Sequence, residues 1–185
     1  MGSLTQPLPV KLFVGVLTSL PETIGAAEEH LSERYGRIDS RSVPFPFDWT
    51  AYYDETMGKP IFRYFLGFEN LVDPSSLAEI KIVTNNLETQ FASQWSQVRR
   101  PINLDPGYLE ESKLVLASTK NFYHRIFLSG GIYAEVTLHY ERGGWRTLPW
   151  TFPDYASEAY HAYFGSLRNI YRDQIKGKKI RQDVR

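Results

Sequence analysis

The sequence predicts a single α+β domain over residues 1–175, built on a mainly antiparallel sheet, followed by a basic C-terminal tail over residues 176–185. Segments with apolar residues at every second position alternate along the chain with segments in which apolar residues recur every three or four positions. Their order is strand, helix, strand, strand, helix, strand, which matches a ferredoxin-like βαββαβ core extended by a β-hairpin and a C-terminal helix. The 185 residues, of which 42% are hydrophobic, suffice for one core.

The first part of the chain is expected to form a strand, a helix and an extended edge. Residues 11–17 alternate as a central strand does when both of its faces are covered. Residues 21–35 carry apolar side chains at helical spacing and are followed by a glycine, which predicts a first helix. Residues 37–49 begin as a strand, but Pro44 and Pro46 predict that this segment finishes as an edge or an extended stretch.

The middle of the chain predicts a loop, a long strand and a second helix. Residues 48–60 are rich in aromatic and acidic groups and are expected to form a loop. Residues 61–69 alternate in hydropathy and predict a strand. Asp73 and Pro74 then supply an N-cap and a first-turn proline, and the apolar periodicity that follows predicts a helix over residues 74–95.

The stretch INLDPGYL, residues 102–109, predicts a type II turn. Pro106 presets φ near −65°, and Gly107 follows where such a turn requires a positive φ. This bend by itself accounts for Asn103 and Asp105, because both residue types favour turns. The alternative is that both side chains, which alternation places on the same side of the chain, belong to a site.

The last part of the chain predicts a hairpin region and a third helix. Residues 113–119, 124–128 and 131–140 have the composition of three successive antiparallel strands joined by short links. Residues 141–155 turn through two glycines and are expected to add one short strand. Residues 156–175 carry one apolar stripe and predict a helix that packs on the sheet.

The charge balance and the lack of cysteine narrow the function classes. Lys plus Arg and Asp plus Glu number 21 each, so no net charge draws the chain toward nucleic acid, a membrane or an acidic partner. The absence of cysteine removes disulfides and Cys-ligated metals and suits a reducing compartment. The N-terminal apolar run is too short and interrupted for a signal peptide or a membrane span. We therefore expect a cytoplasmic protein with no membrane association.

Familiar nucleotide-binding and catalytic motifs are missing from the sequence. There is no G-x-x-x-x-G-K-[ST] phosphate loop, and no G-x-G-x-x-G follows the first strand. The two-histidine phosphoesterases require two His-x-Thr/Ser motifs, and only His30-Leu31-Ser32 fits, inside a predicted helix. These absences leave P-loop, Rossmann and two-histidine phosphoesterase activities without support.

Several phrases along the chain resemble a known family. They are KLFVGVLTS, NLDPGYL, KLVLASTK, HRIFL, GIYAEVTL and WTFPDY, and together they are similar to the bacterial and archaeal family known as domain of unknown function 4416. The resemblance covers nearly the whole chain and implies a one-domain layout. It implies no reaction, but it favours a functional role for the polar positions within these phrases.

Six polar side chains form the predicted site. Catalytic roles are assigned to Asp105, His124 and Glu135. Ligand binding is assigned to Asn103, Lys120 and Arg125. Carboxylates and imidazoles carry general acid–base chemistry, while cationic side chains hold phosphate or carboxylate groups. If the sheet brings the two carboxylates together, we expect them to bind a divalent cation or to show a raised proton affinity.

Each candidate also has a purely structural interpretation. Glu135 shares a strand face with His139, about 13 Å away, and the face is equally typical of the solvated side of an antiparallel sheet. The basic residues around His124 also fit an exposed hairpin. Residues 54–59 form either a mobile lid or an exposed polar loop. The second helix carries a polar ridge that is expected to face solvent, made of Lys81, Asn85 and Glu88.

Two classes of function remain. The first is a small-ligand-binding protein or an enzyme that acts on a phosphorylated or nucleotide-like substrate, with acidic residues holding a divalent cation. The second is a non-catalytic RNA-binding or protein-interaction module, with Phe127 and Tyr133 stacking on bases and the basic tail binding the backbone. We favour the first, because mixed acidic and basic candidates suit a compact polar ligand better than a long polyanion.

Overall fold

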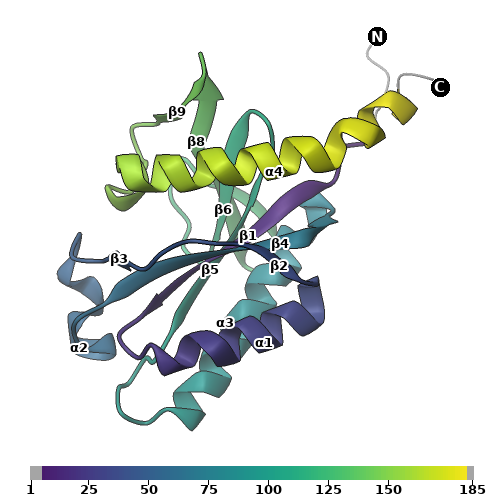
Figure 1. Ribbon diagram of the computed structural model, residues 1–185. Coiled ribbons are helices and arrows are strands. Elements are labelled where there is room, and N and C mark those ends of the chain that lie inside the picture. Colours follow the sequence, from purple (N-terminus) through teal and green to yellow (C-terminus); the bar gives the residue numbers. More distant parts are fainter. Residues whose placement is uncertain (1–5, 183–185) are drawn as a thin grey trace.

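The computed structural model describes residues 6–182, with side chains as far as Lys176. Within these residues nine strands form one open, antiparallel sheet with four helices (Figure 1). The strands are β1 (Val10–Thr18), β2 (Ile38–Arg41), β3 (Phe45–Pro46), β4 (Phe62–Val72), β5 (Asn103–Leu109), β6 (Lys113–Ser118), β7 (Ile126–Ser129), β8 (Ile132–Glu141) and β9 (Gly144–Thr147). The helices are α1 (Glu22–Tyr35), α2 (Asp54–Met57), α3 (Leu77–Gln94) and α4 (Glu158–Gln182). The protein is therefore a single α+β domain.

The order of strands across the sheet is β2-β4-β1-β5-β6-β8-β7, with β3 beside β4 and β9 beside β8. All of these pairings are antiparallel. Figure 1 shows α1 and α3 on one face of the sheet and the long helix α4 across the other. The prediction of a mainly antiparallel sheet with a C-terminal helix packed on it is confirmed.

The central strand β1 contributes to hydrophobic clusters on both sides of the sheet. Leu12 and Val14 pack with residues of α1 and α3, whereas Phe13 packs with Phe164 and Leu167 of α4. Successive side chains of a strand point to opposite faces, so both faces must be apolar where both are covered. This is the arrangement that the alternation over residues 11–17 predicts.

Helix α3 forms where its cap and its periodicity predict it. The Asp73 carboxylate accepts a hydrogen bond from the backbone N–H of Ser75, and Pro74 opens a 3₁₀ turn that leads into the helix. Leu87 and Phe91 then lie in the core beneath β1. The predicted helix over residues 74–95 is confirmed within a residue or two at each end.

The prediction of a type II turn at residues 102–109 is wrong. The segment forms β5, which lies between β1 and β6, and Gly107 does not have a positive φ. A Cβ at Gly107 would lie 2.5 Å from the carbonyl oxygen of Val115 and 2.6 Å from Phe13 Cζ. Glycine is therefore required by the close approach of neighbouring chains, which sequence-local turn statistics do not register.

The remaining elements differ from the predictions mainly at their ends. Residues 48–60 contain a 3₁₀ turn and the short helix α2 rather than an irregular loop throughout. Helix α4 continues to Gln182, through most of the segment predicted as a basic tail, and residues 183–185 of that tail lie outside the described residues. The link between β7 and β8 turns through Gly130 and Gly131, both at positive φ, which glycine adopts without steric cost.

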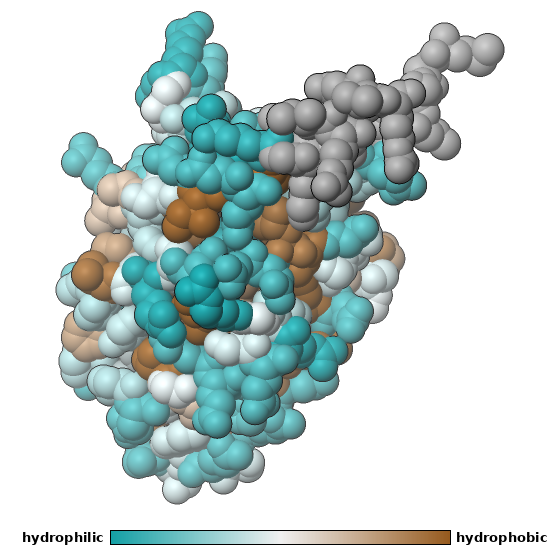
Figure 2. Space-filling model, turned by 45° about the vertical axis from the view of Figure 1, so that its right-hand side comes forward, coloured by the Kyte–Doolittle hydropathy of each residue, from teal (hydrophilic) through white to brown (hydrophobic). Residues whose placement is uncertain are grey.

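The face shown in Figure 2 is covered mostly by hydrophilic residues, with hydrophobic ones between them. Among residues 6–182, none of the helices combines the length and the apolar character that a bilayer-spanning segment requires.

Candidate functional site

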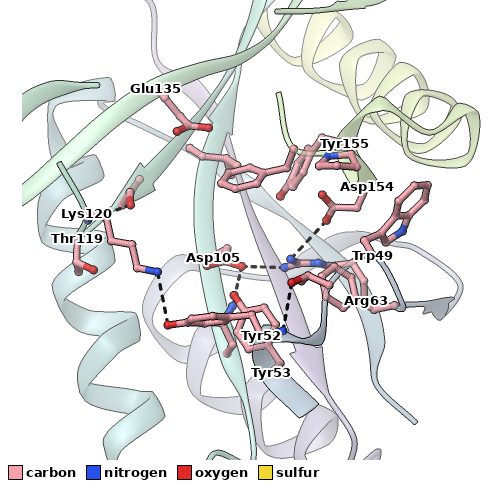
Figure 3. A pocket seen from close by; sticks show the side chains of 18 of the residues that line it. Trp49, Tyr52, Tyr53, Arg63, Asp105, Thr119, Lys120, Glu135, Asp154 and Tyr155 are labelled. Atoms are coloured by element: carbon pink, nitrogen blue, oxygen red, sulfur yellow. Dashed lines mark hydrogen bonds and ion pairs between the residues drawn. The ribbon is translucent and has the colours of Figure 1, made fainter. Parts of the chain in front are cut away.

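A pocket of about 560 Å³ opens where segments from several parts of the chain meet (Figure 3). Its walls come from the loop before α2, from β4, α3 and β5, from β6 and the link to β7, from β8, and from the segment before α4. This volume is within the range of small-molecule sites. The charged side chains that line the pocket are Arg63, Lys81, Arg100, Asp105, Lys120, Arg125, Glu135 and Asp154.

Asp105 is the centre of one group of charges in this pocket. Its Oδ2 atom accepts hydrogen bonds from Arg63 Nη1 at 2.9 Å and from Asn103 Nδ2 at 2.7 Å, and Lys81 Nζ lies 3.7 Å from Oδ1. Burial by itself raises the pKa of Asp105, but Arg63 and Lys81 outweigh it and hold that pKa below its usual value. A raised proton affinity is expected only for carboxylates held near each other, and the neighbours of Asp105 are instead two cations.

The expectation that Lys81 and Glu88 form part of a solvated ridge is also wrong. Lys81 is only 6% exposed, and its ammonium group donates a hydrogen bond to the Leu104 carbonyl oxygen at 2.7 Å. Glu88 accepts hydrogen bonds from the Leu104 N–H at 2.8 Å and from Arg100 Nη2 at 2.9 Å. Burial raises the pKa of Glu88, despite the opposing effect of Lys81 and Arg100. Both side chains of α3 thus face β5, and Lys81 also lines the pocket.

Arg63 and Asp154 are site residues that the sequence interpretation missed. Arg63 comes from β4 and is buried, and its Nη2 atom lies 3.7 Å from Asp154 Oδ2 in the segment before α4. Burial raises the pKa of Asp154, and Arg63 opposes this rise. Two signals were present: Arg63 lies on the same predicted strand face as Phe65, and Asp154 lies within the phrase WTFPDY.

A second group of charges is built around Glu135 of β8. Its Oε2 atom accepts a hydrogen bond from Arg125 Nε at 2.7 Å and lies 3.1 Å from His124 Nε2. The residue is 2% exposed, so the interpretation of this strand face as solvated is wrong at Glu135. His139, on the same predicted face, instead lies 3.7 Å from Glu141 at the far end of the strand.

His124 is packed behind Glu135 rather than in the lining of the pocket. Its ring stacks on Trp150 with 5.1 Å between ring centroids and 6° between planes. Its Nδ1 atom is buried without a hydrogen-bond partner among the described residues. Trp150 in turn donates a hydrogen bond to the Val136 carbonyl oxygen at 2.8 Å, which fixes the indole against β8. Nothing in the local sequence pattern indicated this stacked arrangement.

Lys120 extends across the mouth of the pocket. Figure 3 shows its side chain directed at Tyr52 on the opposite wall. The ammonium nitrogen lies 3.5 Å from Tyr52 Oη and 4.7 Å from the centroid of the ring. Within the part of the chain that the structure describes, no carboxylate forms an ion pair with Lys120, in contrast to Arg63 and Arg125. Lys120 therefore presents a cation that an anionic ligand can neutralise.

Five of the six predicted site residues line this single pocket, and the sixth, His124, contacts it through Glu135. The two carboxylates Asp105 and Glu135 do not form a pair, because each is bound by its own cations. Across residues 6–182 there is no group of three or more His, Asp or Glu side chains arranged to hold a metal ion. Residues 54–59, predicted as a lid or an exposed loop, do not line the pocket, and residues 49–53 form that wall instead.

Comparisons with known proteins identify a family and no close relative of known function. No curated protein and no solved structure matches the chain. The family described as Domain of unknown function (DUF4416) matches residues 8–171, a span that includes every residue that lines the pocket. The chain therefore belongs to the DUF4416 family.

Proposed function

We propose that the pocket binds a small phosphorylated or nucleotide-like ligand and that the protein is an enzyme or a ligand-binding protein for it. The observation that carries the proposal is the cation Lys120, which no carboxylate pairs with among the described residues, lying over the exposed ring of Tyr52 in the same pocket. An anionic group on the ligand neutralises Lys120, and a planar group stacks on the aromatic rings of the pocket. Both interactions are available to one compact molecule.

The charges of the pocket support an anionic ligand. Five cationic side chains and three carboxylates line it, so the lining is net positive although the whole chain is neutral. Ser118 and Thr119 add hydroxyl groups next to Lys120. Hydrogen bonds from cations and hydroxyl groups are the interactions by which proteins hold phosphate.

The aromatic side chains support a planar group in the same ligand. Trp49, Tyr52 and Phe152 line the pocket and remain about half exposed, although large apolar side chains are normally buried. Stacking on such rings is worth about 1–3 kcal/mol for a nucleobase. Burial and the Asp105 charge raise the pKa of Tyr53, next to Tyr52, to about 12, so its phenol stays neutral. A nucleotide-like molecule places its phosphate at Lys120 and its base against these aromatic rings.

The carboxylates divide into two roles in this proposal. Asp105 holds Arg63 and Lys81 in place, because its lowered pKa keeps it ionised between these cations. Glu135 lines the pocket and contacts His124, so this pair is the candidate for proton transfer to or from the ligand. A divalent cation has no ready protein cage here and belongs to the proposal only as a companion of ligand phosphates.

We further infer a ferredoxin-like core and a cytoplasmic location. The elements β1, α1, β2, β4, α3 and β5 follow one another in βαββαβ order, and their four strands are neighbours in the antiparallel order β2-β4-β1-β5. The absence of cysteine supports a reducing compartment. Neither inference specifies the reaction, since one fold hosts many functions.

Calorimetric titration tests the proposed site with AMP, ATP, ribose 5-phosphate and inorganic phosphate, each with and without magnesium. We expect a nucleotide to bind more tightly than ribose 5-phosphate, and Lys120→Gln to weaken binding about tenfold or more, as for one charge-assisted hydrogen bond. Tyr52→Leu tests the aromatic wall in the same way.

The matched control for the titration is Lys113→Gln. The Lys113 ammonium is paired with Glu110 outside the pocket lining, so this variant is expected to bind like the wild type. Thermal unfolding of every variant separates a lost contact from a lost fold. Equal affinity of wild type and Lys120→Gln, or no binding of any of the four compounds, contradicts the proposal.

A further inference from the structure

Exposed apolar side chains follow one another along the edge strand β7 and the residues just before it, and none of them lines the pocket. All four residues of β7 are exposed, and Ile126 keeps 72% of its surface accessible. Gly130, in the turn after β7, lies close to Ile82 of α3, which extends the patch onto that helix. The residues of this patch, called here the β7 surface, are Ile82, Phe122, Tyr123, Ile126, Phe127 and Leu128.

Strand β7 ends the sheet and leaves one row of backbone groups without a strand partner. It pairs with β8 on one side, and no strand among residues 6–182 pairs with its other side. Proteins usually protect such an edge with charged residues or proline. Residues 126–133, IFLSGGIY, contain neither, and only a register irregularity between Phe127 and Ser129 interrupts the ladder.

We propose that two copies of the chain associate through the β7 surface, each adding its β7 strand antiparallel to that of the other across a two-fold axis. Such an interface is isologous, so the surface must be complementary to itself. An uncharged strand meets this condition, because two copies face each other without like charges. The pairing also satisfies the free backbone groups of both edges.

The area of the β7 surface is sufficient for this association. Its six side chains are between 39% and 77% exposed. With four aliphatic or aromatic side chains per copy largely covered, burial is on the order of 600 Å² per copy, which reaches the lower end of the range for specific interfaces. We therefore expect a dimer that dissociates at micromolar dilution rather than a permanent one.

The same surface is less suited to RNA. Base stacking on Phe127 and Tyr133 requires basic side chains nearby to bind the phosphates. Residues 126–138 contain no Lys or Arg, and the Arg125 guanidinium just before them is bound to Glu135, Ser118 and the Lys120 carbonyl oxygen. The chemistry of the edge thus favours a second uncharged strand over a polyanion.

Sedimentation velocity over a range of protein concentrations tests the association. The wild type is expected to approach twice the 21.4 kDa mass of one chain as its concentration rises. Ile126→Lys is expected to weaken association at least about tenfold, because edge lysines oppose strand pairing. Val43→Lys is the matched control, since Val43 is 68% exposed but lies outside the β7 surface. A wild type that stays monomeric at every concentration overturns the proposal, as does dissociation by Val43→Lys alone.

The absence of cysteine permits a second test. Single cysteines are introduced as Phe127→Cys, Leu128→Cys and, for control, Val43→Cys. Near a two-fold axis a cysteine meets its own copy at disulfide distance, so at least one of the two β7 variants is expected to form a covalent dimer under mild oxidation. Failure of both, or equally fast cross-linking of Val43→Cys, overturns the proposal. So does a titration in which single-stranded RNA, rather than a second copy, protects the β7 cysteines from alkylation.

Discussion

Arg63 Nη1 and Asp105 Oδ2 form a 2.9 Å hydrogen bond that passes over the central strand β1. The two residues belong to β4 and β5, which flank β1, and Gly15 of β1 lies opposite Asp105 in the register. A Cβ at Gly15 would stand 2.9 Å from Arg63 Nη1. The floor of the pocket thus depends on a glycine that leaves room for a buried ion pair between non-neighbouring strands.

Removal of the Arg63 charge is expected to destabilise the fold strongly. Arg63→Met leaves the carboxylates of Asp105 and Asp154 without their shared cation, and breaking a buried ion pair from one side costs about 3–5 kcal/mol. Arg41→Met is the control, because the Arg41–Glu28 pair is at the surface and is expected to contribute much less. Urea unfolding measures the free energy of unfolding of both variants. An equal loss in the two would contradict the prediction that the Arg63 ion pairs stabilise the fold.

The two carboxylates Asp105 and Glu88 are expected to give opposite pH dependences. The folded-state pKa of Asp105 is lowered from 3.8, so the stability it contributes is present at neutral pH and is lost as the pH falls through that lowered value. The advantage of wild type over Asp105→Asn should therefore shrink below about pH 3.8.

The folded-state pKa of Glu88 is raised from 4.5, so proton uptake stabilises the folded state. The stability of wild type relative to Glu88→Gln is accordingly expected to increase as the pH falls from neutral toward 4.5. The comparison requires denaturant midpoints of wild type, Asp105→Asn and Glu88→Gln, measured between about pH 2.5 and about pH 7. Parallel curves for both variants would contradict the assigned shifts.

Alanine substitution is expected to change the stability of the protein by an amount that depends on the space around each of three glycines. Gly107→Ala should cost about 1–3 kcal/mol, because its Cβ would meet a backbone carbonyl oxygen at 2.5 Å. Gly15→Ala should cost less, since the nearest atom is the movable end of Arg63. Gly25→Ala, in the open on α1, should stabilise the protein by about 0.5–1 kcal/mol. Any other order in thermal unfolding would contradict the close approach at Gly107.

Truncation of Leu87 is expected to open a cavity under the sheet. Leu87 of α3 is buried in the cluster with Leu12 and Phe91, so Leu87→Ala should lower the free energy of unfolding by about 2–5 kcal/mol. Val43→Ala removes the same kind of group from an exposed position and should have little effect. A loss well below 1 kcal/mol for Leu87→Ala, by the same large-to-small rule, would mean that the helix packs loosely.

Elements whose signals are local could be predicted from the amino-acid sequence. The alternation in β1 and the Asp73-Pro74 cap of α3 each depend on backbone geometry within a few residues, and the structure confirms both. The residue types of Asn103, Asp105, Lys120, Arg125 and Glu135 also make them candidates for one site together with His124, and these five line the same pocket whereas His124 does not.

Which polar side chains are buried, and what they bind, depends on contacts between segments that are far apart in the sequence. The stretch DPGY has the local chemistry of a turn, but β1 and β6 supply ladders on both sides and hold it as β5. From the sequence, Lys81 is expected to face solvent and Arg63 has no assigned role. In the structure both are close to the carboxylate of Asp105 in β5. Burial of a charge becomes favourable only when an opposite charge arrives from another segment, and periodicity along the chain carries no information about that partner.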